Sequence, residues 1–294
     1  MTAASLPPSR TRATLVGGVA VLLWALLAAL TASTGAVPPL QLNAMAFLVG
    51  GLVGVAWAVR ARGWGGFAAV LRGQPPLAWL IGVGGLFGYH ALYFAALRAA
   101  PPAEASLIAY LWPLLIVVMA ALLPGERLRA GHVTGALLGF LGAGLLIAAR
   151  EGGLGTAILP GHLLALGCAV LWSSYSVGSR LMGAVPTEAV AGYCLAAAAL
   201  SVPLHLALEP TVWPADGGEW LAVLGLGLGP VGAAFYAWDR GCKRGDIQLL
   251  GTMAYAAPVL STVVLVALGL ASATWALAAA TVLVTLGAVV ASRA

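Results

Sequence analysis

The sequence predicts an all-α membrane protein of ten transmembrane helices, built as two inverted five-helix repeats with both termini in the cytoplasm. Three observations lead to this fold class: the composition, the number of long apolar stretches and an internal repeat. Hydrophobic residues make up 62% of the 294-residue chain and charged residues only 8%, whereas soluble domains carry about 25% charged residues. The connections are too short for a water-soluble domain, so a separate catalytic or nucleic-acid-binding module is excluded and no nucleic acid is expected as a partner.

Ten stretches of the chain are long and apolar enough to cross a bilayer, which requires about 20 residues of α-helix. These stretches lie at residues 13–33, 38–59, 76–97, 102–122, 131–149, 160–182, 187–208, 217–238, 247–269 and 274–291. The lipid bilayer is therefore the expected surroundings of almost the whole chain.

The basic residues predict the orientation, because cytoplasmic loops retain Lys and Arg. With the N-terminus inside, twelve of the 14 basic residues fall on the cytoplasmic side, and only Arg98 and Arg150 fall outside. The cytoplasmic set is Arg10, Arg12, Arg60, Arg62, Arg72, Arg127, Arg129, Arg180, Arg240, Lys243, Arg244 and Arg293. Both termini are therefore predicted to be cytoplasmic.

An internal repeat divides the chain into residues 1–150 and 151–294, each holding five spans. The pair Leu-Trp at 23–24 and the turn Gly-Ala-Val-Pro at 35–38 return at 171–172 and 183–186. Because five is an odd number, the second copy must enter the membrane from the opposite face, which gives an inverted repeat as in many secondary transporters. The match also favours the first span as part of the fold over a cleaved signal peptide, the other interpretation of an apolar run after Arg10 and Arg12.

Proline interrupts one span at a matching place in each half. Tyr-Leu-Trp-Pro at 110–113 corresponds to Tyr-Ala-Ala-Pro at 255–258. A proline inside a helix removes one donor and crowds the carbonyl four residues back, so Pro113 and Pro258 should free the carbonyls of Ala109 and Ala254. Irregular backbone at membrane depth is tolerated where it lines a cavity or is buried in protein. We expect two hinges beside a cavity, with a simple packing kink as the alternative.

Aromatic and polar residues at membrane depth mark the predicted substrate site. Tyr89, His90 and Tyr93 fall within one arc of about 100° on a helix, and hydrogen bonding between helices is the alternative to a pocket wall. Tyr110 and Trp112 reach one cavity only if their helix breaks. The predicted substrate-binding residues are Tyr89, His90, Tyr93, Tyr110, Trp112, Trp172, Tyr175, Trp238, Gln248 and Tyr255.

Charged side chains are missing from the middle of the predicted spans, which constrains both substrate and coupling. A proton or sodium antiporter usually needs a buried carboxylate, and His90 is the one ionisable acid–base group expected well inside. An aromatic or apolar solute with small polar ends fits this interior better than a highly charged one. The three cysteines show no pairing or metal-ligand spacing, so free thiols, no metal and no cofactor are expected.

The whole chain resembles the drug/metabolite transporter superfamily, EamA type. The resemblance rests on the ten spans, the two repeats, the Gly-Ala-Val-Pro turns and the proline-interrupted helices, and more narrowly on the runs at 88–97 and 109–114, which are similar to bacterial exporters of aromatic amino acids. It implies a multi-pass protein of the bacterial inner membrane that exports Phe, Tyr and Trp by alternating access through a central cavity. An amino acid and the bilayer are then the partners, and a monomer is compatible with this function.

Three alternative functions stay open at this point. The fold also carries exporters of drugs and other small metabolites. An intramembrane enzyme would need catalytic groups at depth, and only Ser173, Ser174 and Ser176 could suggest a nucleophile, although hydroxyls in spanning helices commonly bond to neighbouring backbone. A non-transporting membrane receptor would have no need of matched breaks around aromatic residues.

Overall fold

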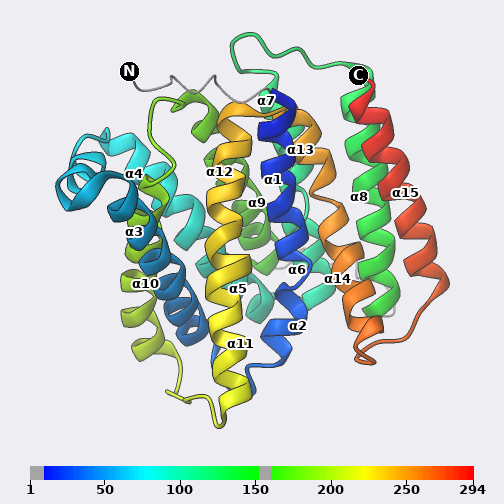
Figure 1. Cartoon of the computed structure of the whole chain (residues 1–294). Coiled ribbons are helices and arrows are strands. Elements are labelled where there is room, and N and C mark those ends of the chain that lie inside the picture. Colours follow the sequence, from blue (N-terminus) through cyan, green and yellow to red (C-terminus); the bar gives the residue numbers. More distant parts are fainter. Residues whose placement is uncertain (1–9, 152–159) are drawn as a thin grey trace.

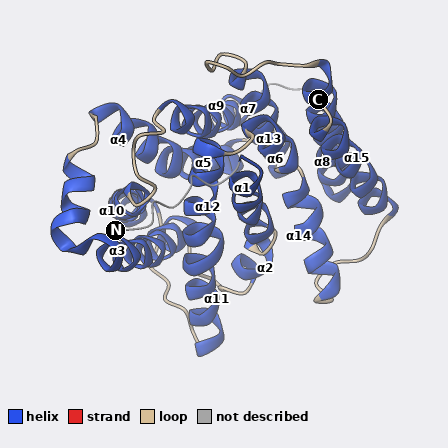
Figure 2. Cartoon of the chain, turned by 45° about the horizontal axis from the view of Figure 1, so that its top comes forward, coloured by secondary structure: helices blue, strands red, loops and turns tan. Residues whose placement is uncertain are grey.

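The protein is an all-helical bundle, seen here in a computed structural model that describes residues 10–151 and 160–294. No strand occurs in these two ranges (Figure 2). The first half contains α1 (Arg10–Trp24), α2 (Leu27–Ala32), α3 (Pro39–Arg72), α4 (Pro76–Val83), the π-helix η1 (Gly84–Gly88), α5 (Tyr89–Ala99), α6 (Pro102–Ala109), α7 (Trp112–Ala120) and α8 (Ala130–Glu151). The second half contains α9 (Pro160–Leu181), α10 (Ala189–Leu208), α11 (Gly217–Leu228), the π-helix η2 (Gly229–Ala233), α12 (Ala234–Arg244), α13 (Ile247–Met253), α14 (Ala256–Ala267) and α15 (Trp275–Ser292).

Within residues 10–151 and 160–294, eight helical segments are long and apolar enough to cross a membrane. They are Arg10–Ala32, Pro39–Arg72, Pro76–Ala99, Ala130–Ala149, Ala189–Leu208, Gly217–Arg244, Ile247–Ala267 and Trp275–Ser292. The predicted span at 102–122 is divided into α6 and α7 and forms only a shorter apolar helix, Glu104–Ala120. The predicted span at 160–182 corresponds to α9, which has 22 residues and a polar Ser-Ser-Tyr-Ser run. The junction between the predicted repeats adjoins residues 152–159, which lie outside the described part of the chain.

The helices of the two halves interlock. The helix α1 packs against α12, and α9, which holds the corresponding place in the second half, packs against α5. The helix α3 packs along α10 at one side of the bundle, and α8 packs along α15 at the other side (Figure 1). Each half therefore buries its apolar surface largely against the other half.

Two helices extend further than the sequence predicts. The helix α3 continues to Arg72 through a kink at Gly63, whose φ of 69° suits a residue without a Cβ. The helix α12 continues to Arg244, beyond the end of the predicted span at residue 238, so that Cys242 is fully buried inside a helix. The reason is that Lys243 bonds to Asp239 one turn earlier, at 2.8 Å, which lets a basic residue remain in a buried helix.

Glycine permits the contact between α1 and α12. A Cβ atom on Gly17 would lie 2.9 Å from the Cα atom of Gly241, closer than real Cβ contacts allow. We expect Gly17→Leu to lower the free energy of unfolding by about 1–3 kcal/mol, because the two helices must move apart. The measurement is the thermal unfolding midpoint in detergent. Gly65→Leu is the control, since a Cβ there meets nothing within 4 Å; equal midpoints for the two variants would contradict the prediction.

Candidate functional site

A cavity lies at the centre of the bundle, between helices of both halves. The space between its walls, open solvent at its mouth included, amounts to about 580 Å³. Its wall consists of Trp24, Leu27, Tyr89, His90, Tyr110, Trp112, Trp172, Pro230, Val231, Phe235 and Ala257. None of these described residues is Asp, Glu, Lys or Arg, so the wall is aromatic and apolar with a few polar tips.

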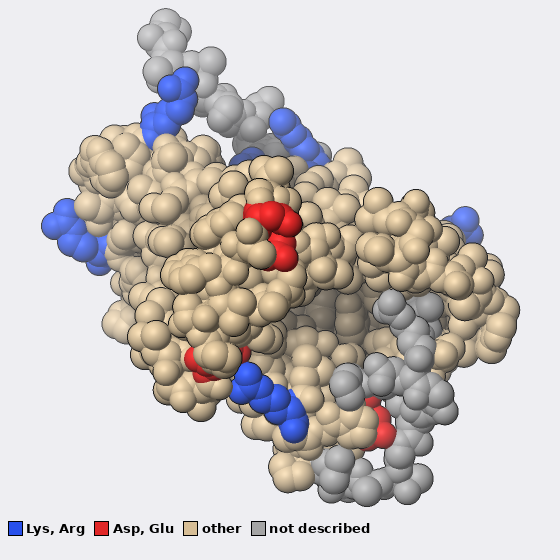
Figure 3. Space-filling view, turned by 90° about the horizontal axis from the view of Figure 1, so that it is seen from below, with Lys and Arg blue, Asp and Glu red and all other residues tan. Residues whose placement is uncertain are grey.

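The cavity opens away from the face that carries Arg10 and Ala294, which we call the terminal face. Leu27 lies at the mouth with 40% of its surface exposed, and its helix α2 lies on the far side of α1 from the terminal face (Figure 1). Figure 3 shows the opposite face, which is hollowed near its middle. Trp238 follows the wall residue Phe235 by one turn of α12 in the direction of Arg244, is fully buried and packs against Trp24 and Trp112, so the cavity is closed on the side of the terminal face.

Four tryptophans pack together at the closed end of the cavity. The ring of Trp24 lies 5.7 Å from that of Trp172, 6.1 Å from that of Trp112 and 5.1 Å from that of Trp238, measured between centroids. Phe235 adds a further ring 5.6 Å from Trp172. Edge and tilted contacts of this kind are favourable beyond the area that they bury, and they present ring faces and edges to a ligand.

The orientation of His90 follows from the π-helix before it. Its Nδ1 atom lies 2.7 Å from the backbone carbonyl oxygen of Leu86 in η1. A carbonyl can only accept, so Nδ1 carries the proton, and in the neutral ring Nε2 is left as an acceptor. Edge contact with Phe47, 5.2 Å between centroids, holds the ring in place. His90 can therefore accept a hydrogen bond from a ligand.

Five of the predicted site residues lie on this wall, namely Tyr89, His90, Tyr110, Trp112 and Trp172. They come from α5, the turn between α6 and α7, α7 itself and α9. The break at Tyr110 and Leu111 is what allows both Tyr110 and Trp112 to reach the same cavity, as the sequence required.

The other five predicted residues are not on the wall. Tyr93 stacks behind Tyr89 at 6.0 Å, and its hydroxyl bonds to that of Ser106 at 2.9 Å. Trp238 is buried, and its Nε1 donates to Ser176 Oγ at 3.0 Å. Gln248, the outlier, sits in the first turn of α13 near the terminal face and donates to the Arg127 carbonyl at 3.4 Å.

Tyr175 and Tyr255 are also absent from the wall, and both are fully buried. The hydroxyl of Tyr255 accepts a hydrogen bond from the backbone N–H of Leu114 at 3.1 Å. Among the residues that the structure describes, neither the hydroxyl of Tyr175 nor Nε1 of Trp172 has a hydrogen-bond partner. Buried polar atoms without partners are rare in folded proteins, so these two atoms need a physical explanation.

Six wall residues were not among the predicted site residues: Trp24, Leu27, Pro230, Val231, Phe235 and Ala257. The repeat carried a signal for three of them. Trp24 matches Trp172 at a spacing of 148, and Phe235 and Ala257 match His90 and Trp112 at the spacing of 145 that relates the two proline motifs. Comparing each predicted residue with its counterpart would have found these three.

The two proline motifs do break their helices. Tyr110 and Leu111 separate α6 from α7, and Ala254 and Tyr255 separate α13 from α14. The carbonyl of Ala254 is not free, however, because it accepts from the N–H of Ala257 at 3.1 Å. Pro258 has no N–H to bond to this carbonyl. The tighter turn at the break supplies the N–H of Ala257 in its place.

We expect Pro113→Ala and Pro258→Ala to shift the balance between the two openings of the cavity, because each restores a backbone donor and favours a straight helix. Single cysteines near each mouth, labelled from either side of the membrane, measure that balance. Wild-type transport rates with unchanged labelling in both variants would show that the prolines are packing features.

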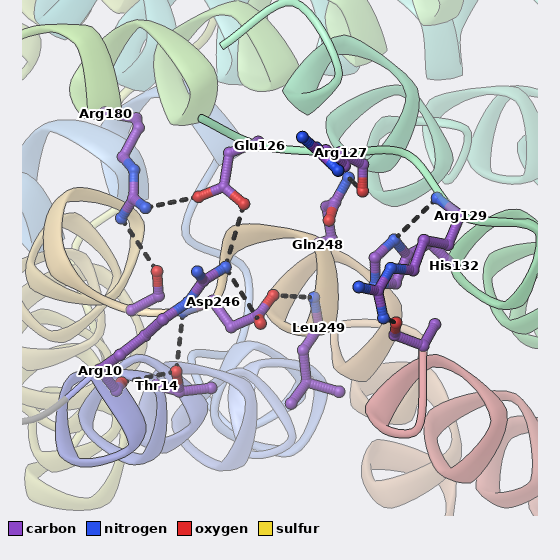
Figure 4. A network of polar contacts seen from close by, with 12 residues as sticks. Arg10, Thr14, Glu126, Arg127, Arg129, His132, Arg180, Asp246, Gln248 and Leu249 are labelled. Atoms are coloured by element: carbon purple, nitrogen blue, oxygen red, sulfur yellow. Dashed lines mark hydrogen bonds and ion pairs between the residues drawn. The ribbon is translucent and has the colours of Figure 1, made fainter. Parts of the chain in front are cut away.

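A network of ion pairs joins both halves at the terminal face (Figure 4). Glu126, in the loop after α7, pairs with Arg10 of α1 at 3.0 Å and also with Arg180 of α9. Arg10 pairs in addition with Asp246, the N-cap of α13, at 3.2 Å. Arg180 donates to the Gly245 carbonyl at 2.9 Å. The network ties together helices that would have to separate for the cavity to open at this face.

Comparison with known proteins identifies the family of the chain. The sequence model of the EamA-like transporter family matches residues 11–148 and 159–293. The chain is 59% identical, over 97% of its length and 98% of the relative's, to a protein of Ancylobacter novellus named aromatic amino acid exporter YddG. It is 26% identical over 65% of its length to an uncharacterized transporter of Bacillus subtilis, YyaM, of which it covers 64%.

A solved crystal structure has the same fold. It superimposes with a TM-score of 0.91 at 58% sequence identity, over 97% of this chain and 98% of the other. The family's sequence model matches the chain twice, once before and once after residues 149–158, and the two matches together cover most of the chain. The chain belongs to the EamA-like transporter family.

Proposed function

We propose that the protein exports the aromatic amino acids phenylalanine, tyrosine and tryptophan by alternating access through the central cavity. The observation that carries the proposal is the wall of that cavity, which presents tryptophan, tyrosine and phenylalanine rings and no Asp, Glu, Lys or Arg among its described residues. A relative that is 59% identical over 97% of this chain bears the name of an aromatic amino acid exporter. Amino acids are therefore favoured over drugs or other metabolites.

The wall offers a place for each part of such a substrate. The aromatic side chain packs among Trp24, Trp112 and Trp172. The ammonium group is attracted by the tryptophan faces and donates to Nε2 of His90. The carboxylate accepts from the hydroxyl groups of Tyr89 and Tyr110. Neutral groups of the wall therefore interact with both charges of the amino acid, which is a zwitterion with no net charge.

The proposed membrane topology has ten spans. Eight segments meet the length and apolarity required, and α6 with α7 and the 22-residue α9 supply the other two. The halves, residues 1–150 and 151–294, form inverted repeats, which is supported by the paired matches of the family and the matched helix breaks. The basic residues favour a cytoplasmic terminal face in the bacterial inner membrane. One chain encloses the cavity, so a monomer is sufficient.

Transport by uniport or exchange, without obligatory ion coupling, is expected from the lack of a carboxylate in the wall. We expect no accumulation above equilibrium when a pH or sodium gradient is imposed on proteoliposomes. His90→Gln provides the check, because His90 is the one titratable imidazole on the wall. Accumulation that disappears in His90→Gln would contradict the prediction and place the coupling at this residue.

The test of the proposed function is counterflow in proteoliposomes. Vesicles loaded with unlabelled phenylalanine should take up labelled phenylalanine, tyrosine and tryptophan, while labelled aspartate and lysine should not enter, since the wall holds no group to neutralise their net charge. The same vesicles are tested with a panel of labelled cationic aromatic drugs, which an exporter of drugs would carry. Uptake of the drugs without uptake of aromatic amino acids would overturn the proposal.

A further inference from the structure

The two halves correspond residue by residue around the cavity. A spacing of 145 relates the π-helices, η1 at Gly84–Gly88 and η2 at Gly229–Ala233, and the same spacing relates Tyr110 to Tyr255. In the first helix of each half the spacing is 148, which relates Trp24 to Trp172 and Leu27 to Tyr175. Every wall residue therefore has an identified counterpart.

The counterparts fall into two groups. In three pairs both members lie on the wall: Trp24 with Trp172, His90 with Phe235, and Trp112 with Ala257. Five wall residues stand there without their counterparts: Leu27, Tyr89, Tyr110, Pro230 and Val231. The counterparts of these five, in the same order, are Tyr175, Ala234, Tyr255, Gly85 and Leu86, and all five are buried. The cavity thus has a symmetric centre, lined by both members of three pairs, and five further wall positions that only one of the two halves supplies.

Hydrogen bonds break the symmetry in the same way. Nε1 of Trp24 donates to the carbonyl of Pro230 in η2 at 3.1 Å. The corresponding donor, Nε1 of Trp172, is buried and has no partner in the described part of the chain. Its corresponding carbonyl, that of Gly85 in η1, nevertheless belongs to a segment packed against α9. One half has made this bond and the other has left its donor unpaired.

The two tyrosines at the helix breaks differ in the same sense. The hydroxyl of Tyr255 is occupied by the N–H of Leu114, whereas Tyr110 faces the cavity. The residue that corresponds to Leu114 is Val259, so the mirror arrangement would place the hydroxyl of Tyr110 on the N–H of Val259 and release Tyr255.

Tyr175 lies on the side of Trp172 where a cavity open at the terminal face would extend. It follows Trp172 by one turn toward the terminal face, whereas Leu27 follows Trp24 toward the opposite face, where the cavity is now open. Its hydroxyl is buried and has no partner within residues 10–151 and 160–294, which is unfavourable. Ser173, next to Trp172, bonds to the carbonyl of Ala169 four residues back at 2.7 Å, a contact that often bends helices.

We infer that Tyr175 and Tyr255 line the substrate cavity when it opens at the terminal face, replacing Leu27 and Tyr110 of the conformation described here. The inference rests on the proposed function, because it requires alternating access by inverted repeats. Trp172 Nε1 then donates to Gly85, and Trp24 Nε1 is released. The substrate keeps the symmetric centre throughout and exchanges one set of hydroxyl groups for another.

Single cysteines test the exchange directly. In a chain with Cys168, Cys194 and Cys242 replaced by Ser, Leu27→Cys should react with a membrane-impermeant maleimide added to intact cells. Tyr175→Cys should react only in inside-out vesicles, where the reagent meets the cytoplasmic side. Excess phenylalanine should slow both reactions. A Tyr175→Cys protein that transports but reacts from neither side, or from the outside, would overturn the inference.

Removal of single hydroxyl groups provides the second measurement. Tyr175→Phe should raise the half-saturating concentration of phenylalanine on the cytoplasmic side by about two- to tenfold, the range for one hydrogen bond, with a smaller change on the opposite side. Tyr110→Phe should do the reverse. Equal effects on both sides in both variants would refute the exchange. If the wild-type protein moves no amino acid, the proposed function fails; if it does, and the side preferences are absent, only this inference fails.

Discussion

Replacement of Trp172 by Ala should lower the transport of aromatic amino acids by about 10- to 100-fold, equivalent to about 1.4–2.8 kcal/mol. Trp172 borders the cavity and lies within 6.5 Å, between ring centroids, of Trp24, Tyr89, Trp112, Tyr175, Phe235 and Trp238. Loss of this ring removes the surface that holds the substrate's own ring and leaves a void among its neighbours. The measurement is initial counterflow rate per purified molecule.

The matched control for this variant is Trp64→Ala. Trp64 has 70% of its surface exposed and lies in the part of α3 beyond the kink at Gly63, away from the cavity. Its loss should leave the counterflow rate close to that of the wild type. A Trp172→Ala protein that folds and transports at the rate of the control would show that the aromatic cavity is not the path of the substrate.

The sequence predicted the parts of the site that depend on local chemistry. The proline motifs broke their helices where the pattern placed them, which brought Tyr110 and Trp112 together. Tyr89 and His90 also reached the wall, but Tyr93, predicted on the same arc, did not, because it stacks on Tyr89 and bonds to Ser106. These features depend on spacing and backbone donors, both of which can be read from the sequence.

Other features depend on partners far away in the chain and could not be predicted locally. No proline or glycine marks the break between α1 and α2 at Ala25 and Leu26; the indole of Trp24 just before it is bound by Pro230, 206 residues later. The carbonyl of Pro230 accepts that hydrogen bond, a role that nothing in the local sequence around Pro230 indicates. Gln248 was selected for its polar side chain, although the Asp246 cap places it in the first turn of a helix near the terminal face.

Replacement of Glu126 by Gln should favour opening of the cavity at the terminal face. Only 7% of the side chain of Glu126 is exposed, and its carboxylate lies between the guanidinium groups of Arg10 and Arg180. Gln retains the shape but removes the charge, so Arg10 and Arg180 are left close together without their counter-ion. We expect the loss of these ion pairs to cost about 1–3 kcal/mol. This is less than the cost of breaking a fully buried pair, because Arg10 is half exposed. That cost applies only while the terminal face is closed.

The native Cys242 provides the reporter for this shift. Its side chain is fully buried in α12, and its carbonyl accepts from Arg180 at 3.4 Å, so the thiol should become accessible as the network separates. With Cys168 and Cys194 replaced by Ser, Glu126→Gln should raise the labelling rate of Cys242 from the cytoplasmic side by about 10-fold, as expected for a shift of about 1.4 kcal/mol.

The control is Glu188→Gln, which removes an ion pair with Arg62 at 2.7 Å on the same side of the molecule. That pair joins α3 and α10, which pack along each other and need not separate when the cavity opens. Its loss should therefore leave the Cys242 labelling rate unchanged. If Glu126→Gln and Glu188→Gln labelled at the same rate, the network at Glu126 would be a structural tie like the other pair, and the terminal face would have to be held closed by the four tryptophans alone.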